Sequence, residues 1–166
     1  MKKLFAFIAT LLLFAACSSD AASSVKPTQP ETQTPKSSAS STSKVGEAPV
    51  KLKIHVNDTT FTATLEENSS AKAFAEFLTQ GDLTLDMHDY GSFEKVADLP
   101  RSFPRNDTQI DTDAGDIILY QGKSITIYYD KNSWNFTRLG KIDNVDKIRL
   151  KQILGKGSVK ATLSIR

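Results

Sequence analysis

The sequence predicts a mainly β domain in which one antiparallel sheet closes into a barrel with a helix capping each end. Apolar and polar residues alternate with a period of two along most of the chain after residue 50, which is the pattern of half-buried strands. Strands do not alternate with helices as they would in a parallel sheet. Because no cysteine follows Cys17, no internal disulfide is possible. A closed sheet would remove the exposed strand edges.

Residues 113–143, DAGDIILYQGKSITIYYDKNSWNFTRLGKID, are the most apolar part of the chain after Cys17. They contain an apolar run at 117–120, an alternating run at 124–129 and a third extended run at 134–142. Turns that contain Gly or Asn separate the three runs. This pattern predicts three consecutive antiparallel strands, and we expect the core of the domain to be built on them.

A hairpin and a helix are predicted before these three strands. The runs 51–56 and 60–66 each alternate apolar and polar residues, which predicts two paired strands with one face inward. Asn68 or Ser69 then caps a helix. Apolar residues spaced at i, i+3, i+4 and i+7 form one stripe along this helix, and Gly81 ends it.

The remaining elements are predicted from shorter signals. Residues 83–87 alternate as a strand, 145–154 read as a second, shorter helix, and 159–165 alternate as a last strand. The alternation is lost over 90–114, a segment that contains Gly91, Pro100 and Pro104 and the basic residues Arg101 and Arg105. We therefore expect 90–114 to be a long surface loop that exchanges its amide protons faster than 116–129, and loops of this kind are often functional.

The first 17 residues predict an export signal. Lys2 and Lys3 precede an apolar run of 11 residues at 4–14, which is too short for a membrane-spanning helix of about 20 residues. The run ends in LFAAC at 13–17, which resembles the signal of bacterial lipoproteins, in which Cys17 would become the lipidated first residue. The alternative is an ordinary secretory signal that happens to contain a cysteine. We expect an exported protein anchored to the cell-envelope membrane through a lipid on Cys17.

The composition then separates a linker from the folded domain. Residues 18–49 contain 9 Ser, 4 Thr and 4 Pro and no aromatic residue, so they cannot bury enough apolar area to offset their chain entropy and are predicted to be disordered. The domain is predicted over 50–166. It has 16 Lys plus Arg and 16 Asp plus Glu. Its net charge of zero offers no basic surface for nucleic acid.

Seven short stretches of the domain carry a family resemblance. In order they are LKI at 52–54, FTATLE at 61–66, AKAF at 71–74, DLP at 98–100, AGDI at 114–117, LY at 119–120 and TRLGKI at 137–142. In their order and spacing the domain resembles the small bacterial cyclophilin-like proteins, over about residues 51–165. The resemblance implies a closed barrel of eight antiparallel strands with two capping helices, in agreement with the periodicity.

The resemblance does not carry the family's catalytic residues over to this chain. Cyclophilins that isomerise prolyl bonds have an Arg in a Phe-His-Arg-x-Ile strand, followed by Gln-Gly-Gly-Asp, and this sequence has neither. The stretch 126–129 lacks the Gln of the family's Gln-Phe-Phe. We expect a module that binds a peptide or small ligand, or has a structural role, without catalysis. The alternative is a divergent peptidyl-prolyl cis–trans isomerase, with Arg101 or Arg105 in place of the usual Arg.

Aromatic residues supply the candidate ligand site. Tyr128 and Tyr129 adjoin in a predicted strand and must face opposite sides, so at least one of them lies outside the core. With residues of the predicted loop, the outer ring would line a groove for an extended peptide. The alternative is that these rings only fill the barrel. The candidate groove residues are Arg101, Phe103, Tyr128, Tyr129, Trp134 and Phe136.

No metal or cofactor site is expected. His55 and His88 fall on the polar sides of their strands without a third His or a Cys, so a zinc site is not predicted. Asp111, Asp113 and Asp116 do not match the ligand spacing of an EF-hand calcium loop, and they are interpreted as a solvated turn.

Overall fold

The computed structural model describes residues 48–155 and 157–165. The predicted signal segment with Cys17, and the predicted linker up to residue 47, lie outside the described residues. The strands are β1 (Lys51–Val56), β2 (Thr59–Leu65), β3 (Leu83–Tyr90), β4 (Glu94–Asp98), β5 (Thr108–Asp111), β6 (Asp116–Tyr120), β7 (Ser124–Tyr128), β8 (Ser133–Ile142) and β9 (Val159–Ser164), and the helices are α1 (Ser69–Thr79) and α2 (Lys147–Leu154).

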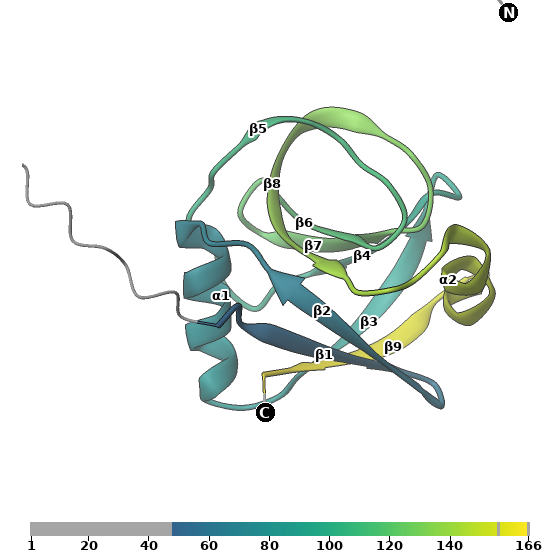
Figure 1. Ribbon diagram of the computed structural model, residues 1–166, viewed down its shortest axis with the longest axis horizontal. Helices are drawn as coiled ribbons and strands as arrows, with labels where there is room; N and C mark the ends of the chain where they lie inside the picture. Colours follow the sequence, from purple (N-terminus) through teal and green to yellow (C-terminus); the bar gives the residue numbers. More distant parts are fainter. Residues whose placement is uncertain (1–47, 156, 166) are drawn as a thin grey trace, which may run out of the picture. The chain divides into compact units, whose positions relative to one another are not determined.

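Eight of these strands form a closed barrel. They are paired in the order β2-β1-β9-β3-β4-β7-β6-β8, and the pairing of β8 with β2 closes the ring. All the pairings are antiparallel. The helices α1 and α2 lie on opposite sides of the barrel (Figure 1). The predicted mainly β class, with an eight-stranded antiparallel barrel and two helices, is confirmed.

The barrel closes where β2 and β8 meet over three residue pairs, Ala63 with Ile142, Thr64 with Lys141, and Leu65 with Gly140. The two backbones approach closely at Gly140. A Cβ atom added there would lie 2.4 Å from the carbonyl oxygen of Thr64. Glycine is therefore required at this position because the space is taken by backbone, which cannot rotate away as a side chain can.

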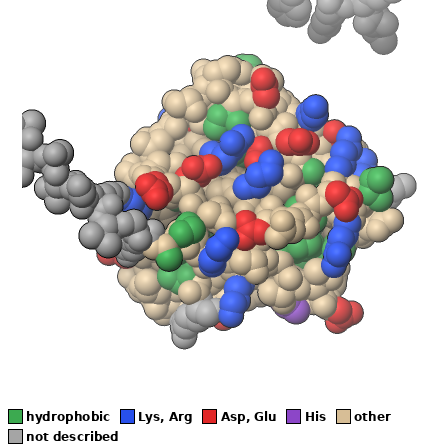
Figure 2. All heavy atoms as spheres, in the orientation of Figure 1, with side chains coloured by type: hydrophobic (Ala, Val, Ile, Leu, Met, Phe, Trp, Pro, Cys, Tyr) green, Lys and Arg blue, Asp and Glu red, His purple; other side chains and the backbone are tan. Residues whose placement is uncertain are grey.

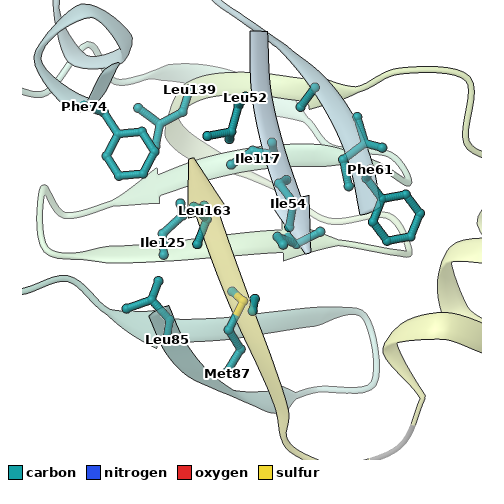
Figure 3. Close-up of a cluster of buried hydrophobic side chains, with 14 of the residues drawn as sticks. Leu52, Ile54, Phe61, Phe74, Leu85, Met87, Ile117, Ile125, Leu139 and Leu163 are labelled. Atoms are coloured by element: carbon teal, nitrogen blue, oxygen red, sulfur yellow. The ribbon is translucent and has the colours of Figure 1, made fainter. Parts of the chain in front are cut away.

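The interior of the barrel is filled by the inward-facing residues of the alternating strands. Leu52 and Ile54 from β1, Ile117 from β6 and Leu163 from β9 are fully or almost fully buried, and their side chains point into one cluster (Figure 3). Helix α1 adds Phe74, which lies in the same cluster. Burial of this apolar surface is the main favourable contribution to folding. The domain has no cysteine, so no disulfide adds to its stability.

Both helices begin at side-chain caps. The backbone N–H of Ala71 donates to Asn68 Oδ1 at 2.8 Å, so of the two predicted caps of the first helix, Asn68 is the one in use. Asp146 accepts in the same way from Arg149 N–H, and the second helix therefore begins at Lys147, two residues later than predicted. Within the ranges that the structure describes, no helix is long and apolar enough to cross a membrane.

The prediction of one long surface loop over 90–114 is wrong. Residues 94–98 form β4, a barrel strand that pairs with β3 on one side and β7 on the other, and β5 pairs with the first residues of β8. The strand β4 was missed because it begins with Glu94 and Lys95, both of which are buried. Charged residues at buried positions hide the period of two.

The loop between β4 and β5 is held by specific contacts. The Phe103 ring packs edge-on against Phe74 and Phe77 of α1, with centroid distances of 5.5 and 5.6 Å. Asn106 Oδ1 accepts hydrogen bonds from Ser70 N–H and Ser70 Oγ at 3.1 and 2.7 Å. Asn106 N–H donates to Thr137 Oγ1 at 2.8 Å. These bonds join the loop to α1 and β8.

The face of the molecule in Figure 2 carries basic and acidic side chains interspersed, with no large patch of one sign. This arrangement agrees with the equal numbers of basic and acidic residues in 50–166.

Candidate functional site

The candidate site lies on the outer face of the barrel, where β3, β4 and β7 are neighbours. In these strands the odd-numbered residues Leu85, Met87, Ala97, Ile125 and Ile127 belong to the core, so the even-numbered residues face outward. The strand register sets the outward residues in rows. One row is His88, Val96 and Thr126, and the next is Tyr90, Glu94 and Tyr128.

The first half of β8 brings aromatic rings to the same face. Its residues Ser133 to Phe136 pair with β5 rather than with β6 or β2. Phe136 packs against Tyr128 with a centroid distance of 5.8 Å, and Phe93 stacks on Tyr128 at 6.0 Å. A second, smaller apolar cluster of Ile118, Tyr128 and Phe136 therefore lies outside the barrel core.

These elements enclose a pocket of about 450 Å³, a volume typical of sites for small ligands. Its lining includes two carboxylates, Glu94 and Asp98, and the imidazole of His88. Among the described residues, no Lys or Arg lines it. The aromatic residues of the lining are Tyr90, Tyr120, Tyr128, Trp134 and Phe136.

Glu94 is a buried carboxyl of the pocket. Its exposed fraction is only 7%, and burial raises the pKa of its carboxyl. Three smaller effects lower this pKa. They come from the hydroxyls of Tyr128 and Thr126 and from the charge of His88. Neither Glu94 Oε2 nor Thr126 Oγ1 has a hydrogen-bond partner within the described part of the chain. A buried carboxylate in a pocket, with one oxygen that lacks a hydrogen-bond partner, is a functional-site signal.

Burial also raises the pKa of the Tyr128 hydroxyl, and the neighbouring Glu94 adds to the shift. Tyr128 is therefore neutral at physiological pH and acts as a hydrogen-bonding group. Its oxygen accepts a hydrogen bond from Asn132 Nδ2 at 3.3 Å. The pocket thus combines a neutral phenol with a buried carboxyl.

Replacing Glu94 by Gln is expected to stabilise the protein at pH 7 more than at about pH 4. The folded state binds the Glu94 proton more tightly than the unfolded state because its pKa is raised. The parent protein therefore loses stability as the pH rises from the unfolded pKa to the folded one. Thermal unfolding at both pH values measures the difference. The exposed Glu76→Gln serves as the control, and an equal effect of Glu94→Gln at both pH values would contradict the expectation.

The structure brings together three of the six residues expected to form a groove. Tyr128, Trp134 and Phe136 line the pocket. Tyr129 belongs to the barrel core and its hydroxyl donates to Asp89 Oδ1 at 2.5 Å. Phe103 lies in the core beneath α1. The guanidinium of Arg101 lies 5.5 Å from the centroid of the Phe103 ring, outside the pocket.

Arg101 lines a second hollow of about 480 Å³ that adjoins the pocket. The two hollows share Asp98, Tyr120 and Ser124, so they lie side by side, and the two together are called the outer groove below. Lys123 also lines the second hollow. The groove is therefore acidic and aromatic at one end and basic at the other.

Sequence reasoning missed Glu94, Asp98 and Tyr90, and it assigned His88 to the solvated surface. Glu94 and Asp98 were missed because β4 was interpreted as loop. A signal was available in the spacing of Glu94, Val96 and Asp98, which places them on one face if the segment is a strand. No group of three or more His, Cys, Asp or Glu residues in the described ranges is placed to hold a metal ion.

The closed eight-stranded barrel with two helices defines a cyclophilin-type β-barrel protein. The family model described as the cyclophilin-like family matches residues 54–166, and the chain belongs to this family. Among solved structures, the chain is similar to the solution structure of a hypothetical protein from Archaeoglobus fulgidus. The identity is 16%, the match covers 73% of this chain and 99% of that one, and the TM-score is 0.48. No curated protein matches the chain.

Proposed function

We propose that this protein is a membrane-tethered cyclophilin-like lipoprotein whose barrel binds a peptide in the outer groove without catalysis. The observation that carries the proposal is the pocket of Glu94, in which a buried carboxyl with one oxygen lacking a hydrogen-bond partner lies among aromatic residues. Ligand sites are typically concave and largely apolar, with a few polar groups that orient the ligand. The pocket has this composition.

The chain supplies its own reporter for binding. Trp134 is the only tryptophan of the sequence, it is 61% exposed and it lines the pocket. A mixture of short peptides of random sequence is expected to change the fluorescence of Trp134 and the NMR shifts of Tyr90, Glu94 and Asn132. Shifts confined to other faces of the barrel, or no change at all, would contradict the proposal.

Prolyl isomerisation is the second candidate function, since Arg101 lines the second hollow of the groove. The observations favour it less. Arg105 pairs with Asp107 and Arg101 lies over Phe103, so neither lines the pocket of Glu94. We expect an NMR exchange assay on an Ala-Pro peptide to show no turnover above background. Turnover that disappears in Arg101→Ala or Arg105→Ala would instead establish the isomerase.

The tether is the second part of the proposal and rests on the sequence before residue 50. A fatty-acid analogue fed to cells is expected to label the protein, and Cys17→Ser is expected to abolish the label. A flexible linker of the 32 residues 18–49 would span about 30 Å on average and hold the barrel away from the membrane. A soluble, unlabelled mature protein in cells with intact lipoprotein processing would overturn the tether.

A further inference from the structure

We propose that the pocket of Glu94 receives the cationic side chain of a Lys or Arg from an extended peptide. This inference rests on the proposed binding function and adds the chemical class of the ligand. The inference rests on the charge of the pocket, on its aromatic walls and on the second hollow that adjoins it.

The acidic lining of the pocket favours a positively charged ligand. Glu94 and Asp98 both line it, and within the described chain the only basic side chain in the lining is His88, an exposed residue of β3. Glu94 is almost fully buried, and its Oε2 has no donor from any described residue. A buried carboxylate is costly unless it is paired with a charge and hydrogen-bonded. An ammonium or guanidinium group supplies both, whereas a neutral donor supplies only the hydrogen bond.

The aromatic walls suit the same ligand. The cross-strand neighbours of Glu94 are Tyr90 on β3 and Tyr128 on β7, so the carboxyl lies between two rings, and Trp134 lines the pocket as well. Aromatic faces attract cations and also cover the apolar stem of a long basic side chain. Tyr90 and Trp134 are 59% and 61% exposed, which leaves their rings available to a ligand.

The shape of the groove favours a peptide over a small free amine. The second hollow adjoins the pocket at Asp98, Tyr120 and Ser124, and each hollow has the volume of a separate ligand site. A small amine would fill only the first hollow. An extended chain would place its basic side chain against Glu94 and continue along the shared residues.

The test is a titration of the full-length protein followed by Trp134 fluorescence. The probes are Ac-Ala-Lys-Ala-NH2, Ac-Ala-Arg-Ala-NH2, the uncharged norleucine analogue of the lysine peptide, and butylammonium. We expect the Lys and Arg peptides to bind at least about tenfold more tightly than the norleucine peptide and than butylammonium. Glu94→Gln is expected to lose that preference, and Asp98→Asn to weaken it, while the exposed carboxylate variant Glu76→Gln binds like the parent protein.

Each other outcome overturns a defined part of the proposal. Equal binding of the norleucine and lysine peptides, or an undiminished preference in both Glu94→Gln and Asp98→Asn, overturns the cation site and leaves peptide binding intact. Butylammonium that binds as tightly as the lysine peptide overturns the peptide as the occupant. If no peptide of any charge binds, the proposed binding function fails together with this inference. Circular dichroism establishes that each variant is folded before it is titrated.

Discussion

Gly140→Ala is expected to lower the free energy of unfolding by about 3 kcal/mol, because it places a methyl group where β2 and β8 close the barrel. The new Cβ would lie 2.4 Å from Thr64 O and 3.1 Å from the Leu65 Cα atom. Both are backbone atoms of β2, so the clash is relieved only if a strand moves. The seam consists of three residue pairs, and such a movement would weaken all of them.

Urea denaturation measures this effect, and the chain offers a matched control. Gly81 has no atom within 4 Å of its added Cβ and has no positive φ, so Gly81→Ala is expected to change stability by less than about 0.5 kcal/mol. The position of the urea midpoint is compared between the two variants. If Gly140→Ala unfolds at the same urea concentration as Gly81→Ala, the close approach of β2 and β8 is not as the structure describes it.

Lys95→Met is expected to destabilise the domain by about 3 kcal/mol, because it removes the three hydrogen bonds that a fully buried ammonium group donates. The Lys95 side chain is fully buried. Its Nζ donates to Asp89 Oδ1 at 2.8 Å, to Gly155 O at 3.1 Å and to Gly157 O at 2.6 Å. Methionine fills a similar volume but donates none of these bonds. We therefore assign the expected loss to the missing hydrogen bonds rather than to a cavity.

The surface pair of Lys160 with Asp86 provides the comparison for Lys95→Met. Lys160 Nζ lies 2.7 Å from Asp86 Oδ1, but both side chains are largely exposed. Exposed ion pairs contribute little because water and salt screen them, so Lys160→Met is expected to leave the unfolding midpoint almost unchanged. Equal midpoints for the two Met variants would show that the bonds of Lys95 do not stabilise the domain.

Lys95 also shows why one strand of the barrel was not predictable from the sequence. Its partners Gly155 and Gly157 come about 60 residues later in the chain. No local pattern indicates that two carbonyl groups will meet its ammonium group there. A charged residue with such partners can face the interior of a barrel, whereas the period of two assigns every charged residue to the solvent.

The candidate site was only partly predictable from the sequence, again because the positions of some side chains depend on distant segments. The alternation along β7 requires Tyr128 and Tyr129 to face opposite sides, which the structure confirms. Tyr129 faces inward because it is in phase with Ile125 and Ile127, and its hydroxyl there donates to Asp89 of β3. Phe103 was expected in the groove but fills a space beneath α1. The position of Phe103 depends on how the loop between β4 and β5 packs against α1. That packing cannot be predicted from the residue types of the loop alone.

The sequence by itself determined the barrel class, the two helices and most strand positions of this protein. Those features depend on interactions between residues close in the chain, namely alternation, helix caps and turns. The tertiary structure alone decided that β4 belongs to the barrel, that Gly140 lies at the seam, and that Glu94 is buried among aromatic residues with its Oε2 lacking a partner. Each of these depends on which distant segments meet, because burial and missing partners are properties of the packed strands and not of any one segment.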